Sequence, residues 1–209
     1  MRALLLIDIQ NDFLPGGALA VTDGDKVIPV ANALSARSDL FPVVAMSQDW
    51  HPAGHRSFAS NNPGAAVGQL GELDGLSQVM WPDHCVQGTL GAEFDVRLDV
   101  RNVAHVTRKG QDPAVDSYSA FFDNGRRHAT DLADYLRGRG VDEVFVLGLA
   151  TDYCVKWTAL DALSLGFRTH VVVDGCRGVA LSPDDIPRAF EEMLAAGVTM
   201  VASRDLLAA

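Results

Sequence analysis

Cysteine is scarce in this sequence, which has only three among 209 residues. Cys85, Cys154 and Cys176 stand at wide and irregular spacing, and no two of them form a Cys-x-x-Cys pair. Disulfide-stabilised domains and zinc ribbons need more cysteines in regular spacings, so the sequence argues against both. We expect three reduced thiols, as in a cytosolic protein.

Positive charge is also in short supply. The chain has 17 Lys and Arg residues against 27 Asp and Glu residues, for a formal net charge of -10. The positive side chains are dispersed, and the overall field would repel a phosphate backbone or an anionic membrane. We therefore expect neither a nucleic acid nor a membrane as a partner.

Long apolar runs are missing, although 48% of the residues are hydrophobic. No run approaches the roughly 20 residues that cross a bilayer. Residues 2–9 are too short for the core of a signal peptide, include Asp8, and precede no small-residue cleavage site. The expected location is the cytoplasm.

Short apolar runs, by contrast, recur along the chain and are too continuous to be half-exposed strands. Segments with helical spacing lie between most of them. This alternation predicts one domain over residues 1–209, a three-layer α/β/α sandwich with a doubly wound, mainly parallel six-stranded sheet. The expected strands cover residues 3–9, 43–47, 103–107, 144–149, 170–173 and 199–202, and the expected helices cover 25–36, 130–139, 152–165 and 183–196.

Residues 52–100 interrupt the alternation. The segment is rich in Gly, Pro, Asn and Asp and is much longer than an ordinary connection. Long irregular segments in compact domains tend to be functional loops, so we expect this one to shape a site.

The Gly-x-Gly motif that binds phosphates is absent after the first expected strand, where Asp-Ile-Gln-Asn-Asp-Phe13 stands instead. A Rossmann dinucleotide site is therefore not expected, despite the similar sheet.

Three reactive side chains lie just beyond expected strands, where sheets of this kind bind ligands. Asp8 closes the first strand, Lys109 follows the third, and Cys154 opens the helix after the fourth. A thiolate in the first turn of a helix is stabilised by free N–H groups, and a carboxylate can take the thiol proton. Together these residues are suited to acyl transfer. Each alone also fits a structural role: a turn cap, a solvated lysine and a small buried side chain.

A second group of residues has the composition of a divalent-metal site. Asp49 and His51 would point the same way from an extended chain, and His84 could approach from the long loop. Three protein ligands leave positions open for water or substrate. Asp and His are both common in surface loops, so the Asp-x-His spacing alone fits either a metal site or an ordinary polar loop.

Six segments, in this order, resemble the isochorismatase-like cysteine hydrolases. Two of them, Trp-Pro-Asp-His and Asp-Ser-Tyr-Ser-Ala-Phe-Phe, favour the nicotinamidase branch of that family. The match spans almost the whole chain and implies a Rossmann-like α/β domain. The segments cover residues 8–13, 48–51, 81–86, 108–110, 116–122 and 148–155.

The resemblance implies a cysteine amidohydrolase of NAD salvage that converts nicotinamide to nicotinate and ammonia. Cys154 would attack the carboxamide carbon, Asp8 would move the proton, and Lys109 would hold both by charge. The oxyanion would lie against the backbone N–H groups of Ala150 and Cys154, and the peptide bond leading into Ala150 is expected to be cis. Water would then hydrolyse the acyl-thioester.

The same resemblance implies one divalent ion, with Zn favoured and Fe or Mn as alternatives. Asp49, His51 and His84 would hold it, and its open position would bind the pyridine nitrogen. His55 does not stand at the spacing of the extra histidine that some relatives use, so it is left out of the ligand set.

Three aromatic residues, Phe13, Trp81 and Tyr118, match residues that wall the family's pocket, and flat apolar walls suit a flat heteroaromatic ring. Pyrazinamide is expected as a second substrate. Two other functions stay open: an isochorismatase-like amidase for a different small amide, which needs no metal, and a non-catalytic binding module. The oligomeric state, monomer or homodimer, is not decided by the sequence.

Overall fold

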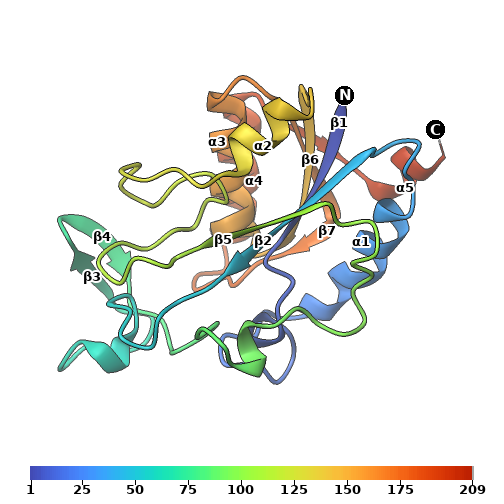
Figure 1. The fold of residues 1–209 in the computed structure, drawn as a ribbon. Coiled ribbons are helices and arrows are strands. Elements are labelled where there is room, and N and C mark those ends of the chain that lie inside the picture. Colours follow the sequence, from blue (N-terminus) through green and yellow to red (C-terminus); the bar gives the residue numbers. More distant parts are fainter. Residues whose placement is uncertain (209) are drawn as a thin grey trace.

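The computed structural model describes residues 1–208 and is built around a six-stranded sheet (Figure 1). All neighbouring strands in this sheet pair in parallel. In the order β5-β2-β1-β6-β7-β8, the strands are His105–Lys109, Val43–Asp49, Arg2–Ile7, Glu143–Leu149, Arg168–Arg177 and Thr199–Val201.

The central strands are buried along their length, which explains their continuous apolar sequences. Every residue of β2 and of β6 is buried, and only Arg2 of β1 is exposed. Strands covered on both faces have no polar side to alternate with. The expected parallel sheet is therefore confirmed, and the largest difference is in β7, which begins two residues before the expected 170–173 and continues four residues beyond it.

Helices cover both faces of the sheet. α1 (Val27–Ser35) and α5 (Ser203–Leu207) lie on one side, whereas α2 (Leu132–Gly138), α3 (Lys156–Ser164) and α4 (Asp185–Ala196) lie on the other (Figure 1). The expected helix over 152–165 begins as a π-type turn, Thr151–Val155, that leads into α3. α5 was not expected from the sequence. Within residues 1–208 no helix has the length and apolar character needed to cross a membrane.

The strand order reverses between β1 and β6, and the candidate site lies beyond the ends of the strands at this point. Along the chain, strands are added outward from β1 through β2 to β5 on one side, and through β6, β7 and β8 on the other. The connections that follow β1 and β6 diverge at this switch point and leave a crevice beyond the carboxyl ends of the strands. Residues just after β1, β2, β5 and β6 therefore meet there.

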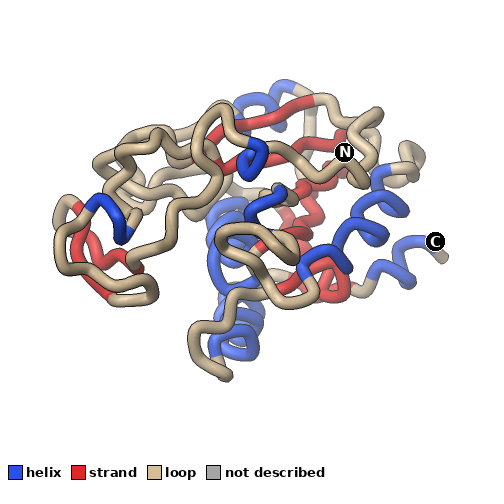
Figure 2. Tube along the Cα trace, turned by 90° about the horizontal axis from the view of Figure 1, so that it is seen from below, coloured by secondary structure: helices blue, strands red, loops and turns tan. Residues whose placement is uncertain are grey.

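The sequence predicted an irregular segment over residues 52–100, but part of it has regular structure. It contains a two-stranded antiparallel hairpin, β3 (Leu70–Leu73) and β4 (Leu76–Val79), set apart from the main sheet (Figures 1 and 2). Asp74 and Gly75 connect the strands with φ values of 51° and 81°. Two-residue hairpin turns of type I′ need positive φ at both positions, which Asp-Gly provides.

Candidate active site

Asp8, Lys109 and Cys154 converge beyond the sheet, although 146 residues separate the first from the last. β1 lies between β2 and β6, so Asp8 after β1 and Cys154 after β6 come from neighbouring strands. Lys109 ends β5 and reaches inward across the end of β2. Its ammonium nitrogen Nζ is 2.9 Å from Asp8 Oδ2 and 3.5 Å from Cys154 Sγ.

Lys109 is the centre of this network. Besides Asp8 and Cys154, its ammonium contacts Asp49 Oδ1 at 2.8 Å and donates to the backbone carbonyl of Ser117 at 2.9 Å. The register of the sheet aligns Asp49 with Lys109. The Lys109 and Asp8 side chains are both 0% exposed, so the ammonium is the counter-charge for two carboxylates in a water-poor site.

Charges within the network set the protonation of its members. Burial opposes the charge on Lys109, but the carboxylates of Asp49 and Asp8 raise the pKa of its ammonium well above the usual value. Burial likewise opposes ionisation of Asp49, yet Lys109 and His51 hold the pKa of that carboxyl well below its usual range. For Asp8, burial and the charge of Asp49 outweigh Lys109, and its pKa is raised. A carboxylate with a raised pKa is suited to accept a proton.

Cys154 differs from the expectation that its position in a helical turn would favour the thiolate. Burial, with smaller contributions from Asp8 and Asp49, raises the pKa of its thiol well above the ordinary value, although Lys109 lowers it. The sulfur lies in the buried π-type turn that precedes α3 rather than at an exposed helix end. A thiol with a raised pKa would need a neighbouring base in order to act as a nucleophile.

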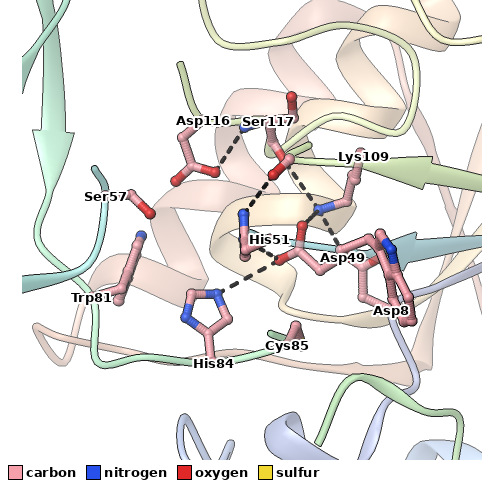
Figure 3. Close-up of polar contacts among 12 residues, drawn as sticks. Asp8, Asp49, His51, Ser57, Trp81, His84, Cys85, Lys109, Asp116 and Ser117 are labelled. Carbon is pink, nitrogen blue, oxygen red and sulfur yellow. Dashed lines mark hydrogen bonds and ion pairs between the residues drawn. The ribbon is translucent and has the colours of Figure 1, made fainter. Parts of the chain in front are cut away.

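Asp49, His51 and His84 lie together, with donor atoms within 4.8 Å of one another. Figure 3 shows the Asp49 carboxylate between Lys109 on one side and the two imidazoles on the other. Asp49 Oδ2 is 3.3 Å from His51 Nε2 and 3.6 Å from His84 Nε2.

The tautomers of both histidines are set by backbone carbonyls. His51 Nδ1 donates to Gly110 O, and His84 Nδ1 donates to Pro82 O, each at 2.8 Å. With both rings neutral, as ligands of a metal ion are, each Nε2 carries a lone pair that faces Asp49. His51 Nε2 is buried without a hydrogen-bond partner. Two imidazole lone pairs beside one carboxylate fit a divalent metal ion.

His55 lies next to this cluster and is fully buried. Its Nδ1 accepts the backbone N–H of Ser57 at 3.2 Å, so the proton of the neutral ring is on Nε2. Burial, with the nearby His51, lowers the pKa of His55 to about 4. His51, His55 and Asp116 also lie within metal-binding distance of one another, but a protonated Nε2 is no ligand, so this tautomer favours the first cluster.

The expected aromatic walls surround a narrow cavity that the thiol, Asp49 and His84 share. Phe13, Trp81 and Tyr118 line it together with Leu19, Asp116, Ala150, Tyr153 and Val179. Trp81 and Tyr153 meet edge to face with their ring centres 4.9 Å apart. A wider cavity extends along β5, but of the residues expected in the site it is lined only by Lys109.

The backbone leading to Ala150 has the expected form, since the Leu149–Ala150 peptide bond is cis. Ala150 and Cys154 both border the aromatic cavity. The structure thus brings every residue expected from the sequence into one region beyond the sheet.

Several supporting residues were not expected from the sequence. Ser47 donates to Asp8 Oδ1 at 2.6 Å. Gly110, besides its bond to His51, lies so close to that ring that a Cβ would be 2.3 Å from His51 Cε1. Gly110 belongs to a segment that the family resemblance had singled out, but the need for a bare backbone beside His51 is visible only in three dimensions.

A model of the isochorismatase domain matches residues 2–205. The chain belongs to the isochorismatase family. Among curated members, nicotinamidase from Escherichia coli is 54% identical over 208 residues, which are 98% of this chain and 96% of that protein.

Solved structures place this isochorismatase-family chain among the same relatives. A nicotinamidase/pyrazinamidase from Acinetobacter baumanii has a TM-score of 0.94 at 46% identity, covering 98% of this chain and 97% of that one. Pyrazinamidase from Pyrococcus horikoshii, described in complex with zinc, has a TM-score of 0.79 at 40% identity, covering 96% of this chain and 98% of that one.

Proposed function

We propose that this protein is a nicotinamidase, which hydrolyses nicotinamide to nicotinate and ammonia in cytoplasmic NAD salvage, and that it also accepts pyrazinamide. The observation that carries the proposal is the position of Asp49. Its carboxylate contacts Lys109 through Oδ1 and faces two imidazole lone pairs through Oδ2, so the thiol and the metal-competent cluster share one cavity. The identity and coverage of the curated nicotinamidase relative support the same substrate.

The chemistry begins with the proton of Cys154. Asp8 accepts it, and the sulfur forms a bond to the carboxamide carbon while the carbonyl π-electrons move to the oxygen. The backbone N–H groups of Ala150 and Cys154 are assigned to that oxyanion. Donors of this kind stabilise a transition state by about 3 to 4 kcal/mol each. When the C–N bond breaks, Asp8 returns the proton to the departing ammonia.

Hydrolysis of the thioester uses the same base. Asp8 takes a proton from water as the water oxygen attacks the acyl carbon. The C–S bond then breaks, Asp8 returns the proton to the departing sulfur, and the nicotinic acid loses its own proton to solvent and leaves as nicotinate. Lys109 remains protonated throughout, because both carboxylates raise its pKa. Its charge stabilises the thiolate that forms 3.5 Å away.

Asp49, His51 and His84 are the residues assigned to hold one divalent ion, for which zinc is the favoured identity. When bound, the ion supplies a Lewis acid for the pyridine nitrogen and so orients the ring. Phe13, Trp81 and Tyr118 restrict that ring to one plane, as flat apolar side chains do for a flat substrate.

The deciding experiment measures ammonia release from nicotinamide by the purified protein. Cys154→Ala is expected to release none, whereas Cys176→Ala, which removes another buried thiol that lies outside the cavity, is expected to keep activity. If wild-type protein releases no ammonia after reconstitution with zinc, the proposal is wrong.

Chelation separates this function from the alternative, an amidase for another small amide. The proposal predicts that a chelator abolishes nicotinamide hydrolysis and that zinc restores it. Full activity in metal-stripped protein would instead favour an amidase that uses Cys154 and Asp8 without an ion.

A further inference from the structure

We propose that Gln10 and Asp12, two side chains of the segment that follows β1, position the metal ligands Asp49 and His84. Neither belongs to the catalytic residues or to the metal ligands assigned above. The inference concerns how the metal site is held in place, and it rests on the metal part of the proposed function.

The Gln10 side chain forms hydrogen bonds with both the N–H and the C=O of Asp49. Its Oε1 accepts the Asp49 N–H at 2.8 Å, and its Nε2 donates to the Asp49 carbonyl, also at 2.8 Å. Nε2 makes a further bond of 2.8 Å to Ala92 O. The side chain is fully buried, so without it the N–H and C=O of Asp49 would lose partners where water does not replace them.

Gln10 also contacts the backbone of Asp8, the residue proposed as the base. Its backbone N–H donates to the carbonyl of Asp8 at 2.8 Å, and Asp8 has a φ of 46°. That left-handed conformation is uncommon for residues other than glycine and needs support from the surrounding structure. One residue therefore fixes both the backbone of the base and the backbone of a metal ligand on the neighbouring strand.

Asp12 acts on the other side of the metal cluster. Its Oδ2 accepts the N–H of Cys85 at 2.7 Å, and Cys85 directly follows His84 and has a φ of 46°. The carbonyl of Cys85 in turn accepts the N–H of His51 at 3.0 Å. The Asp12 carboxylate thus holds Cys85, whose backbone is covalently joined to His84 and hydrogen-bonded to His51.

Glycine at position 91 provides the space for this arrangement. A Cβ there would lie 2.1 Å from Asp12 Oδ2. The carboxylate therefore rests directly against bare backbone of the 52–100 segment. Gln10 reaches the same segment through Ala92, so the residues after β1 join the sheet to the loop that carries His84.

The test compares zinc binding by Gln10→Met and Gln48→Met. Methionine keeps the length of glutamine but removes both polar groups. Gln48 is a matched control, because it is also buried and also donates to Ala92 O, at 3.0 Å, yet its other bond goes to Arg108 instead of Asp49. Zinc affinity is measured on metal-stripped protein by competition with a chelating dye, and the visible spectrum of the Co²⁺ form reports ligand geometry.

We expect Gln10→Met to bind zinc about 10 to 100 times more weakly than wild type and to shift the Co²⁺ bands, as loss of an outer-shell partner does. Gln48→Met is expected to retain the wild-type affinity and spectrum. Equal weakening in the two variants would overturn the role of Gln10. So would a lower unfolding temperature of metal-free Gln10→Met with an unchanged affinity and spectrum, because that pattern indicates a structural role only.

Asp12 is tested by its conservative variant, which also serves if Gln10→Met does not fold. Asp12→Asn keeps an oxygen for the Cys85 N–H and should restore most of the affinity lost in Asp12→Ala. Equal losses in the two would assign the effect to charge and overturn the positioning role of Asp12. Wild-type protein that binds zinc without hydrolysing nicotinamide would refute the proposed function alone. If wild type and Asp49→Asn bind zinc equally weakly, the metal site and the positioning role fail together.

Discussion

Lys109→Met is the substitution that we expect to disturb the site most. The ammonium of Lys109 lies 2.9 Å from Asp8 Oδ2 and 2.8 Å from Asp49 Oδ1, and these three side chains are at most 6% exposed. Methionine fills similar space, so the main change is the loss of one positive charge between two buried carboxylates.

The size of the effect follows from burial. Removing one partner of a buried ion pair typically costs about 3 to 5 kcal/mol of unfolding free energy, because the remaining charge has no compensation. Lys156→Met provides the matched control. Lys156 pairs with Glu192 at 2.9 Å, but the Glu192 side chain is 46% exposed, so screening limits its contribution to about 1 kcal/mol or less.

The unfolding free energy that Lys109→Met loses relative to wild type should also depend on pH. The charges determine whether this loss grows or shrinks as the pH rises. Without the ammonium, burial and the charge of Asp49 raise the folded-state pKa of Asp8 further above the unfolded value of about 3.9. The folded variant then keeps a proton that the unfolded chain has lost. Its stability relative to wild type therefore falls as pH rises through that window, by about 1.4 kcal/mol per pH unit for each such proton.

Urea unfolding of the metal-free proteins, followed by tryptophan fluorescence and circular dichroism, measures both quantities. The deficit is expected to be smaller at about pH 5 than at about pH 8. Adding Asp8→Asn to Lys109→Met should recover part of it, because one of the uncompensated charges is gone. A deficit below about 1 kcal/mol, or an equal deficit at both pH values, would refute the charge assignment.

Three further perturbations test other parts of the site. Alkylation of Cys154 in metal-free protein should keep accelerating as pH rises beyond neutrality, because burial raises the pKa of this thiol; a plateau near neutral pH would contradict that assignment. Gly110→Ala would place a Cβ 2.3 Å from His51 Cε1 at a φ of 67°, so zinc retained after gel filtration should fall sharply, and retention at the wild-type level would argue against this contact. Ser47→Ala removes the hydrogen bond that lowers the pKa of Asp8, so the acid limb of the pH–rate profile should move to higher pH; no shift would mean that Asp8 is not the titrating base.

The sheet could be predicted because its central strands are buried on both faces and their apolar runs are unbroken. The hairpin of β3 and β4 was missed for the opposite reason. Leu70 is 67% exposed and the strands have only four residues each, so burial imposes no pattern on them. The remaining signal was the Asp74-Gly75 dipeptide, which is typical of a two-residue hairpin turn.

Site residues could be predicted where chemistry selects the side chain. A thiol and a carboxylate at strand ends, and an Asp-x-His pair with a further histidine in the long loop, are recognisable without coordinates. Supporting contacts such as Gln10 with Asp49 join a side chain to backbone groups 39 residues away, and only the pairing of β1 with β2 brings them together. The expectation of a stabilised thiolate counted the helical turn and neglected complete burial, which acts in the opposite direction and raises the pKa of Cys154.

A raised thiol pKa is nevertheless compatible with nucleophilic catalysis when the pKa of the base that accepts the thiol proton is raised as well. Burial raises the pKa values of both Asp8 and Cys154, so the two groups disfavour charge in the same environment. Transfer of the proton from sulfur to carboxylate moves one negative charge across the ammonium of Lys109, which lies between them at 2.9 and 3.5 Å, and leaves the net charge of the cavity unchanged. The cost of desolvation is therefore largely the same before and after transfer. The cysteine can stay protonated at rest and still form a thiolate beside a fixed cation, provided that Lys109 keeps its charge.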